Sequence, residues 1–173
     1  MKYILNLILA IFSINAYTST FYYDNADPFT DEITEISFGS FASQNRNEFF
    51  GIICNAPDFI PQFAVMQRNI TGNKGDKIRT TFRFDKNQAF SQDLIHPGDE
   101  GSLNITYGVN NSSSKTFNIT KDEFLSFISN FLNQLKSSKK LILKVDGKEK
   151  ISTFDVSNSS ANVKKLLNNC PGL

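Results

Sequence analysis

The sequence predicts a mainly β protein with two helices, whose antiparallel sheets form a β-sandwich-like arrangement and whose C-terminal helix is tethered by a disulfide. Three observations lead to this prediction. The chain contains 17 Phe, 5 Tyr and no Trp, and many Phe alternate with polar or β-branched residues at the period-two spacing of strands. Two stretches repeat their apolar residues at spacings of three and four, as helices do. The two cysteines are enough for one disulfide.

The first residues predict a secretory signal peptide. Lys2 is followed by an apolar run over residues 4–14 and then by the small residue Ala16. The run is too short to cross a bilayer, which takes about 20 residues. We therefore expect cleavage after Ala16, with a signal peptide over residues 1–16 and a single β-sandwich-like domain over residues 17–173. The mature chain is expected to be periplasmic or secreted and to have no transmembrane segment.

The chain is close to electrically neutral, with 18 basic and 17 acidic residues, and Lys2 is the only charged residue of the predicted leader. Proteins that bind nucleic acid rely on a surplus of basic residues to contact phosphates. We therefore expect no nucleic-acid partner and favour another protein or a component of the cell envelope.

Several strands are predicted in the first half of the chain. Residues 32–41 alternate loosely, and residues 49–54 and 62–67 are short runs suited to a core strand. Residues 77–85 have the clearest period-two pattern. One face of that segment carries Ile78, Thr80, Phe82 and Phe84, and the other carries Arg79, Thr81, Arg83 and Asp85. Because residues 73–76 (NKGD) have turn chemistry, we expect the segments on either side of them to pair antiparallel.

A loop, a strand and a helix are predicted next. Residues 94–101 (LIHPGDEG) favour a loop because Pro and two Gly interrupt them, and residues 102–109 favour a strand. Thr120 is a natural N-cap for a helix, and two acidic residues follow in its first turn. The apolar face of this helix carries Phe124, Phe127, Ile128, Phe131, Leu132 and Leu135.

The end of the chain is predicted to form a hairpin and a short helix. Residues 139–156 contain two strand-like segments around Asp146-Gly147, a pair that favours a two-residue turn. Ser157 or Ser159 can cap the final helix. The hairpin carries Leu141, Leu143 and Val145 on one strand and Ile151, Thr153 and Phe154 on the other, and the buried face of the final helix carries Val163, Leu166, Leu167 and Cys170.

Predicted export makes the two cysteines informative. In an oxidising compartment they most simply form one disulfide, and a bond between Cys54 and Cys170 would hold the final helix against a core strand. A reactive thiol is the alternative, but neither cysteine has a neighbouring His or a CxxC partner. The sequence therefore predicts a structural disulfide.

The sequence contains one candidate for acid/base or metal chemistry. His96 is the only histidine, and Asp99 and Glu100 follow it closely. A metal site needs several ligands, and a catalytic triad needs a positioned nucleophile, neither of which this segment supplies. We therefore predict no catalytic residue, no metal and no cofactor, with His96 as an exposed loop residue. If the loop is a recognition loop, these three residues are candidate partner contacts.

Two further candidates lie in the segment with the clearest alternation. Arg83 and Asp85 share its polar face, where they can form a structural ion pair or contact a partner. A lysine cluster over residues 136–150 can contact an acidic partner, or it can be the solvated face of the last hairpin.

Several short motifs resemble those of bacterial exported proteins. They are DPFTDE near the mature start, Cys54 in a core strand, FRFD at residues 82–85, the central helix before a lysine-rich strand, and the ending FDVSNSSANVKKLLNNC. In these motifs the chain is similar to the type VI secretion-associated accessory proteins and, more distantly, to the invasion-associated locus B proteins.

The chain also departs from that group. It has Phe21-Tyr22-Tyr23 where relatives often carry Trp, and Asn158 where they often carry Gly. Asn tolerates the left-handed backbone region better than most residues, so the same turn is compatible with Asn158. The resemblance implies a β-sandwich-like domain with a disulfide-tethered terminal helix and no enzymatic activity, and it brings no catalytic residues.

These observations together predict an exported, non-enzymatic binding or accessory protein of the bacterial envelope or secretion apparatus. Three alternatives stay open. The protein can be a periplasmic inhibitor or immunity protein that blocks a hydrolase or toxin with residues 94–101. It can be a secreted virulence factor that binds host cells, or an enzyme that depends on His96.

Overall fold

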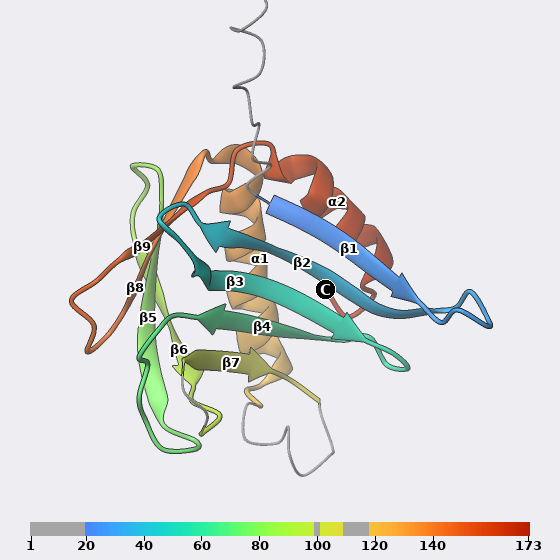
Figure 1. Cartoon of the computed structure of the whole chain (residues 1–173), viewed down its shortest axis with the longest axis horizontal. Helices are drawn as coiled ribbons and strands as arrows, with labels where there is room; N and C mark the ends of the chain where they lie inside the picture. The colour runs from blue at the N-terminus through green and yellow to red at the C-terminus, as the bar shows by residue number, and fades with distance from the viewer. Residues whose placement is uncertain (1–19, 99–100, 109–117) are drawn as a thin grey trace, which may run out of the picture.

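The computed structural model describes residues 20–98, 101–108 and 118–173, so the predicted signal peptide, Asp99 and Glu100 lie outside the described residues. Within these ranges the chain forms nine strands and two helices (Figure 1). They are β1 (Thr20–Ala26), β2 (Ile33–Ala42), β3 (Asn45–Asn55), β4 (Ile60–Met66), β5 (Lys77–Phe84), β6 (Phe90–Ile95), β7 (Ser102–Thr106), α1 (Lys121–Ser137), β8 (Lys140–Val145), β9 (Ser152–Asp155) and α2 (Ser159–Asn169).

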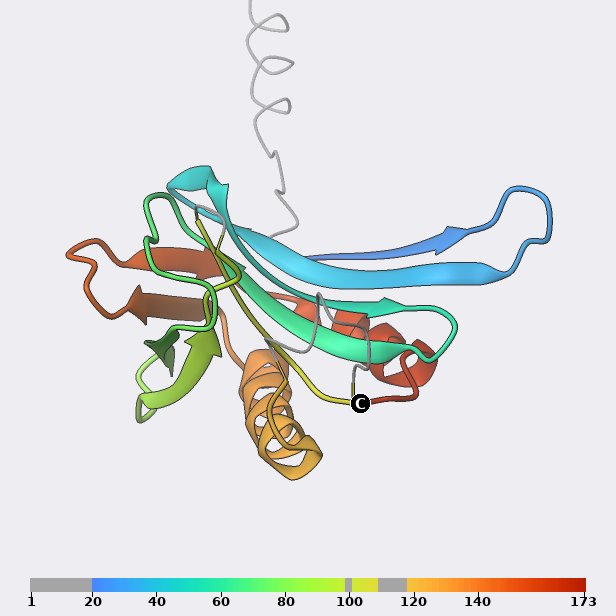
Figure 2. The same ribbon diagram turned by 90° about the horizontal axis from the view of Figure 1, so that it is seen from below.

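The strands belong to one antiparallel sheet in the order β1-β2-β3-β4-β7-β6-β5-β8-β9. Its two halves meet between β6 and β7, where Ile95 pairs with Asn104. Figures 1 and 2 show the half with β5, β6, β8 and β9 turned steeply against the half with β1 to β4 and β7. The mainly β class with two helices is therefore confirmed, and the sheets of the expected sandwich are two halves of one bent sheet.

Helix α1 packs inside the bend and brings the phenylalanine-rich core together (Figure 2). Its Phe131 ring lies 5.5 Å from that of Phe50 on β3 and 5.3 Å from that of Phe84 on β5, centroid to centroid. Phe127 lies 5.0 Å from Phe63 on β4. These edge-to-face contacts are the geometry that aromatic pairs favour. One helix therefore joins both halves of the sheet through its buried stripe.

Both predicted helices are present. In α1 the Thr120 hydroxyl accepts a hydrogen bond from the Glu123 N–H at 3.2 Å, and the six predicted apolar residues are all buried. In α2 the N-cap is Asn158, with φ 63°, instead of either predicted serine. The Ser159 hydroxyl donates to the Leu135 carbonyl at 2.6 Å and so connects the two helices. Neither helix in the described part of the chain is long and apolar enough to cross a membrane.

The predicted pairing across residues 73–76 is wrong. β4 pairs with β3 and β7, whereas β5 pairs with β6 and β8, because the connection between β4 and β5 crosses from one half of the sheet to the other. Turn chemistry marks where a chain can reverse, but it does not fix which strands lie beside one another. Strand β1 was not predicted at all, and β6 includes two residues assigned to the 94–101 loop.

The hairpin of β8 and β9 is confirmed, but its turn is longer than two residues. The outermost pair is Leu143 with Ser152, and residues 146–151 connect the strands. This register buries Ser152 and Phe154, whereas Ile151, which was predicted to belong to the returning strand, precedes β9 and is exposed.

Candidate functional site

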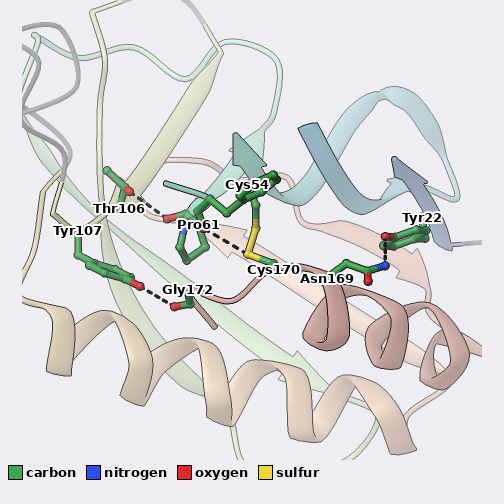
Figure 3. The surroundings of a disulfide bond; sticks show 9 residues. Tyr22, Cys54, Pro61, Thr106, Tyr107, Asn169, Cys170 and Gly172 are labelled. Carbon is green, nitrogen blue, oxygen red and sulfur yellow. Dashed lines mark hydrogen bonds between the residues drawn. A yellow bond between two sulfur atoms is a disulfide. The ribbon is translucent and has the colours of Figure 1, made fainter. Parts of the chain in front are cut away.

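A disulfide fixes the C-terminal end of the chain beside β3. Cys54 on β3 and Cys170, which follows α2, are both buried and form the predicted disulfide across 116 residues of sequence (Figure 3). Asn169 adds a second contact, because its side-chain N–H donates to the Tyr22 hydroxyl of β1 at 2.6 Å. The disulfide is therefore structural, and it holds the end of the final helix against a core strand, as the sequence predicted.

The residues after Cys170 are also packed. The Tyr107 hydroxyl donates to the Gly172 carbonyl at 2.5 Å (Figure 3). A Cβ atom on Gly172 would lie 2.6 Å from Pro61 Cδ and 2.8 Å from the Phe59 carbonyl oxygen, so the close approach requires glycine. Burial raises the pKa of Tyr107 because the anionic form loses hydration. These contacts pack the last residues of the chain against the sheet.

The prediction that His96 is exposed is wrong, because the residue is 2% exposed. The connection between β4 and β5 folds over it, and its backbone N–H donates to the Asp76 carbonyl at 2.9 Å. Its Nδ1 accepts from the Gly98 N–H at 3.0 Å, while Nε2 has no hydrogen-bond partner among the described residues. Pro97 and Gly98 do form a loop, but that loop packs down and removes His96 from any contact surface.

Arg83 and Asp85 do not form the predicted ion pair within the described part of the chain. Asp85 has φ 47°, and its carboxylate turns toward β8, where it accepts from the backbone N–H groups of Lys139 and Lys140 at distances down to 2.9 Å. Arg83 stays exposed. The charged pair on this side of the sheet is Arg79 with Asp93, 3.0 Å apart across β5 and β6, and this hydrogen bond raises the pKa of Arg79. The role of Asp85 is therefore structural.

On the other half of the sheet, residues without a charged side chain form three neighbouring rows, bordered by Glu35, whose carboxylate accepts from the Ser37 hydroxyl at 2.6 Å. Cross-strand partners share a face of a sheet. On the face opposite α1, three neighbouring rows of paired residues run across β1, β2, β3, β4 and β7, and we call them the outer face. The rows are Phe41, Phe49, Met66 and Ser102; Phe21, Gly39, Gly51, Ala64 and Asn104; and Tyr23, Ser37, Ile53, Gln62 and Thr106.

Large apolar side chains on the outer face reach solvent. Tyr23 is 55% exposed, Phe41 50% and Met66 48%. The rings of Phe21, Phe41 and Phe49 lie 5.5 to 5.9 Å apart and form one cluster. Figure 1 shows these strands in front of α1, on the side that neither helix covers. Toward β7 the rows become buried, at Ala64, Asn104 and Thr106. Several exposed apolar side chains on one face mark a contact surface more often than a single exposed residue does.

Phe49 also has a structural role on this face. Cβ atoms on Gly39 and Gly51, which pair with each other, would lie 2.5 Å and 2.2 Å from ring atoms of Phe49. The ring therefore lies flat over the two glycines and fills the space that their missing side chains leave. Phe41 and Met66 have no such covering role, so together with Tyr23 they are the exposed side chains of the outer face that can contact a partner.

On the side away from the β6–β7 junction, a polar network joins the two halves of the sheet a second time. There the Ser43 N–H, in the turn after β2, donates to the Thr153 carbonyl of β9 at 2.8 Å. Behind this contact the buried Glu48 carboxylate accepts from Ser152 Oγ at 2.6 Å, and the same hydroxyl accepts from Gln67 Nε2 at 2.8 Å. We call this junction the seam.

A pocket of about 390 Å³ opens at the seam. Its lining includes Glu48 and Gln67 on the inside and Arg68, Lys148 and Lys150 around them. Lys148 and Lys150 belong to the predicted lysine cluster, whose other lysines are exposed. The structure thus presents two candidate binding sites, a flat apolar face and a small polar pocket.

Comparison with protein families, characterised proteins and solved structures finds no match for this chain. The resemblance to secretion-associated and invasion-associated proteins therefore stays a prediction.

Sequence reasoning missed the outer face and the buried part of the seam for two different reasons. It assigned phenylalanines to the core as a class, although Phe38 and Phe41 are three residues apart on one strand and so must face opposite ways. That spacing, and the adjacent pair Phe49-Phe50, could have identified the outward aromatic residues. The seam could not have been found, because Glu48 and Ser152 are 104 residues apart in the chain.

Proposed function

We propose that this chain is an exported, non-enzymatic binding protein of the bacterial envelope or secretion apparatus, and that the outer face contacts a partner protein. The observation that carries this proposal is the uncharged patch of aromatic and methionine side chains on that face. Cores of protein interfaces are enriched in aromatic residues and Met and depleted of charge.

The composition of the outer face also indicates the partner's chemistry. Its three rows contain no acidic or basic side chain, and Glu35 borders them only beside Ser37. Away from that edge, a charged ligand would gain nothing from the rows in exchange for its lost hydration. An apolar protein surface loses little hydration when it binds, and burial of Phe41 and Met66 against it contributes favourable free energy. We therefore expect a partner with an apolar contact surface that is poor in charge.

The alternative of an inhibitor that acts through residues 94–101 receives less support. His96 is buried, so it would need to unpack before it could contact a target. The outer face needs no rearrangement to bind, and preformed surfaces avoid that cost.

The proposal is tested with the tagged mature protein. Proteins crosslinked to it in its own envelope fraction are identified by mass spectrometry, and each is purified so that its Kd can be measured. We expect one partner to bind saturably, and the Phe41→Ser/Met66→Ser double variant to weaken its binding about tenfold or more.

Phe29→Ser is the matched control. Phe29 is 94% exposed in the connection between β1 and β2, at the opposite end of β2 from Phe41. Its loss removes an exposed ring without changing the outer face, so affinity should be unchanged. A partner that binds the double variant as tightly as the wild type, or the absence of any saturable complex, would overturn the proposal.

A further inference from the structure

The seam pocket contains a buried carboxylate, that of Glu48, whose cationic partner makes only a long contact with it. Glu48 is 3% exposed, and Asn45 Nδ2 at 3.1 Å and Ser152 Oγ at 2.6 Å donate to its two oxygens. Its ionic partner is the ammonium of Lys150, 3.8 Å away, on a side chain that is 66% exposed. A buried carboxylate is stable only when its charge is well paired. This long contact leaves Glu48 able to accept a better-placed cation.

A second unfilled acceptor lies beside the carboxylate. Gln67 Nε2 donates to Ser152 Oγ and to the Lys150 carbonyl, whereas its Oε1 is buried and has no hydrogen-bond partner among the described residues. A buried acceptor without a donor costs stability, so it is an unusual feature of a purely structural network. Gln67 and Glu48 are joined through the Ser152 hydroxyl, and both line the pocket. An ammonium group has three N–H donors, so one such group could serve both residues.

The rim of the pocket has the opposite charge. Arg68 and Lys148 line it, together with Lys150 and the exposed Glu149. A ligand that displaces the Lys150 ammonium from Glu48 leaves that lysine free to join Arg68 and Lys148. The lining of the pocket would then contain one buried carboxylate and three cations. Guanidinium and ammonium groups bind carboxylates through charge-assisted hydrogen bonds.

We propose that the seam pocket binds a small zwitterion of the α-amino acid type, with its ammonium group on Glu48 and Gln67 and its carboxylate among Arg68, Lys148 and Lys150. The volume of about 390 Å³ is within the range of small-molecule sites. None of these residues belongs to the outer face, so this proposal is independent of the proposed function.

The test uses L-glutamine as the probe and two derivatives that each lack one charge. N-acetyl-L-glutamine has no ammonium group, and L-glutamine amide has no α-carboxylate. Binding to the mature protein is measured by calorimetry at low ionic strength. We expect saturable binding of L-glutamine, and binding about tenfold or more weaker for each derivative, because each loses one charge-assisted contact.

Variants of the pocket provide the second part of the test. Glu48→Gln should weaken L-glutamine binding about tenfold, and Arg68→Gln and Lys148→Gln should weaken it severalfold. Because Glu48→Gln also changes the seam network, the two rim variants carry the test if that variant fails to fold. Lys144→Gln, an exposed lysine of β8 outside the pocket, is the control with the same charge change and should bind normally.

The proposal is overturned if L-glutamine shows no saturable binding, or if both derivatives bind as tightly as it does. It is also overturned if Arg68→Gln and Lys148→Gln bind L-glutamine with the affinity of the wild type.

Discussion

The hydroxyl of Tyr107 donates a hydrogen bond of 2.5 Å to the carbonyl oxygen of Gly172, next to the last residue of the chain. This bond and the Cys54–Cys170 disulfide hold the same corner, one through a side chain beyond β7 and the other through β3. The C-terminal end is therefore fixed at two places of the same half of the sheet, and each attachment can be tested separately.

Loss of the disulfide should destabilise the whole domain. The bond closes a loop of 116 residues, for which chain entropy predicts about 4 to 5 kcal/mol, with about 2 to 4 usually realised. We expect the Cys54→Ala/Cys170→Ala double variant to lose about 2 to 4 kcal/mol of unfolding free energy in urea titrations. Hydrogen exchange should rise more in α2 than in α1. A variant as stable as the wild type would contradict this expectation.

The Tyr107 contact predicts a pH dependence at the alkaline end. Burial raises the Tyr107 pKa above its ordinary value of 10.0, so the unfolded chain releases this proton at a lower pH than the folded one does. The stabilisation is therefore complete below about pH 10 and is lost as the pH rises through the folded-state pKa. Tyr107→Phe should lack this component. Urea unfolding between pH 8 and 11 measures the free energy of unfolding of both proteins. If this free energy changed with pH in the same way in the wild type and the variant, the prediction would be wrong.

Phe49 and Phe41 are neighbours on the outer face with different expected effects. Phe49 covers Gly39 and Gly51, so Phe49→Ala should cost about 2 kcal/mol of unfolding free energy. Phe41 is half exposed, so Phe41→Ala should cost about 0.5 to 1 kcal/mol. Urea titration of the two variants compares these costs directly. Equal costs would show that the ring of Phe49 does not support the two glycines.

Asp85 should matter for stability, and Arg83 should not. Asp85→Ala loses the bonds to the Lys139 and Lys140 N–H groups and places Ala at φ 47°, so we expect a loss of about 2 kcal/mol. Asp85→Asn keeps one acceptor and tolerates that φ, so its loss should be intermediate. Arg83→Ala should change the unfolding free energy by less than about 0.5 kcal/mol. Thermal and urea unfolding report these differences, and a large effect of Arg83→Ala would revive the ion-pair interpretation.

Local patterns in the sequence determined much of the secondary structure. The α1 stripe from Phe124 to Leu135 was predicted in full, because helix periodicity and the Thr120 cap depend on residues within a few positions of one another. The alternation of Thr80, Phe82 and Phe84 was likewise correct. The Cys54–Cys170 bond could be predicted because two cysteines offer a single intramolecular pairing.

The tertiary structure alone decided which strands pair and which surfaces are available for binding. The turn at residues 73–76 could not reveal that β5 pairs with β8, because strand pairing depends on packing between segments far apart in sequence. Burial of His96 follows from the connection that folds over it. The carboxylate of Glu48 meets Ser152 of β9 and Lys150, which precedes that strand. Sequence periodicity fixes which residues share a face of one strand. Only the packed sheet determines which face reaches solvent and which distant polar groups meet at the seam.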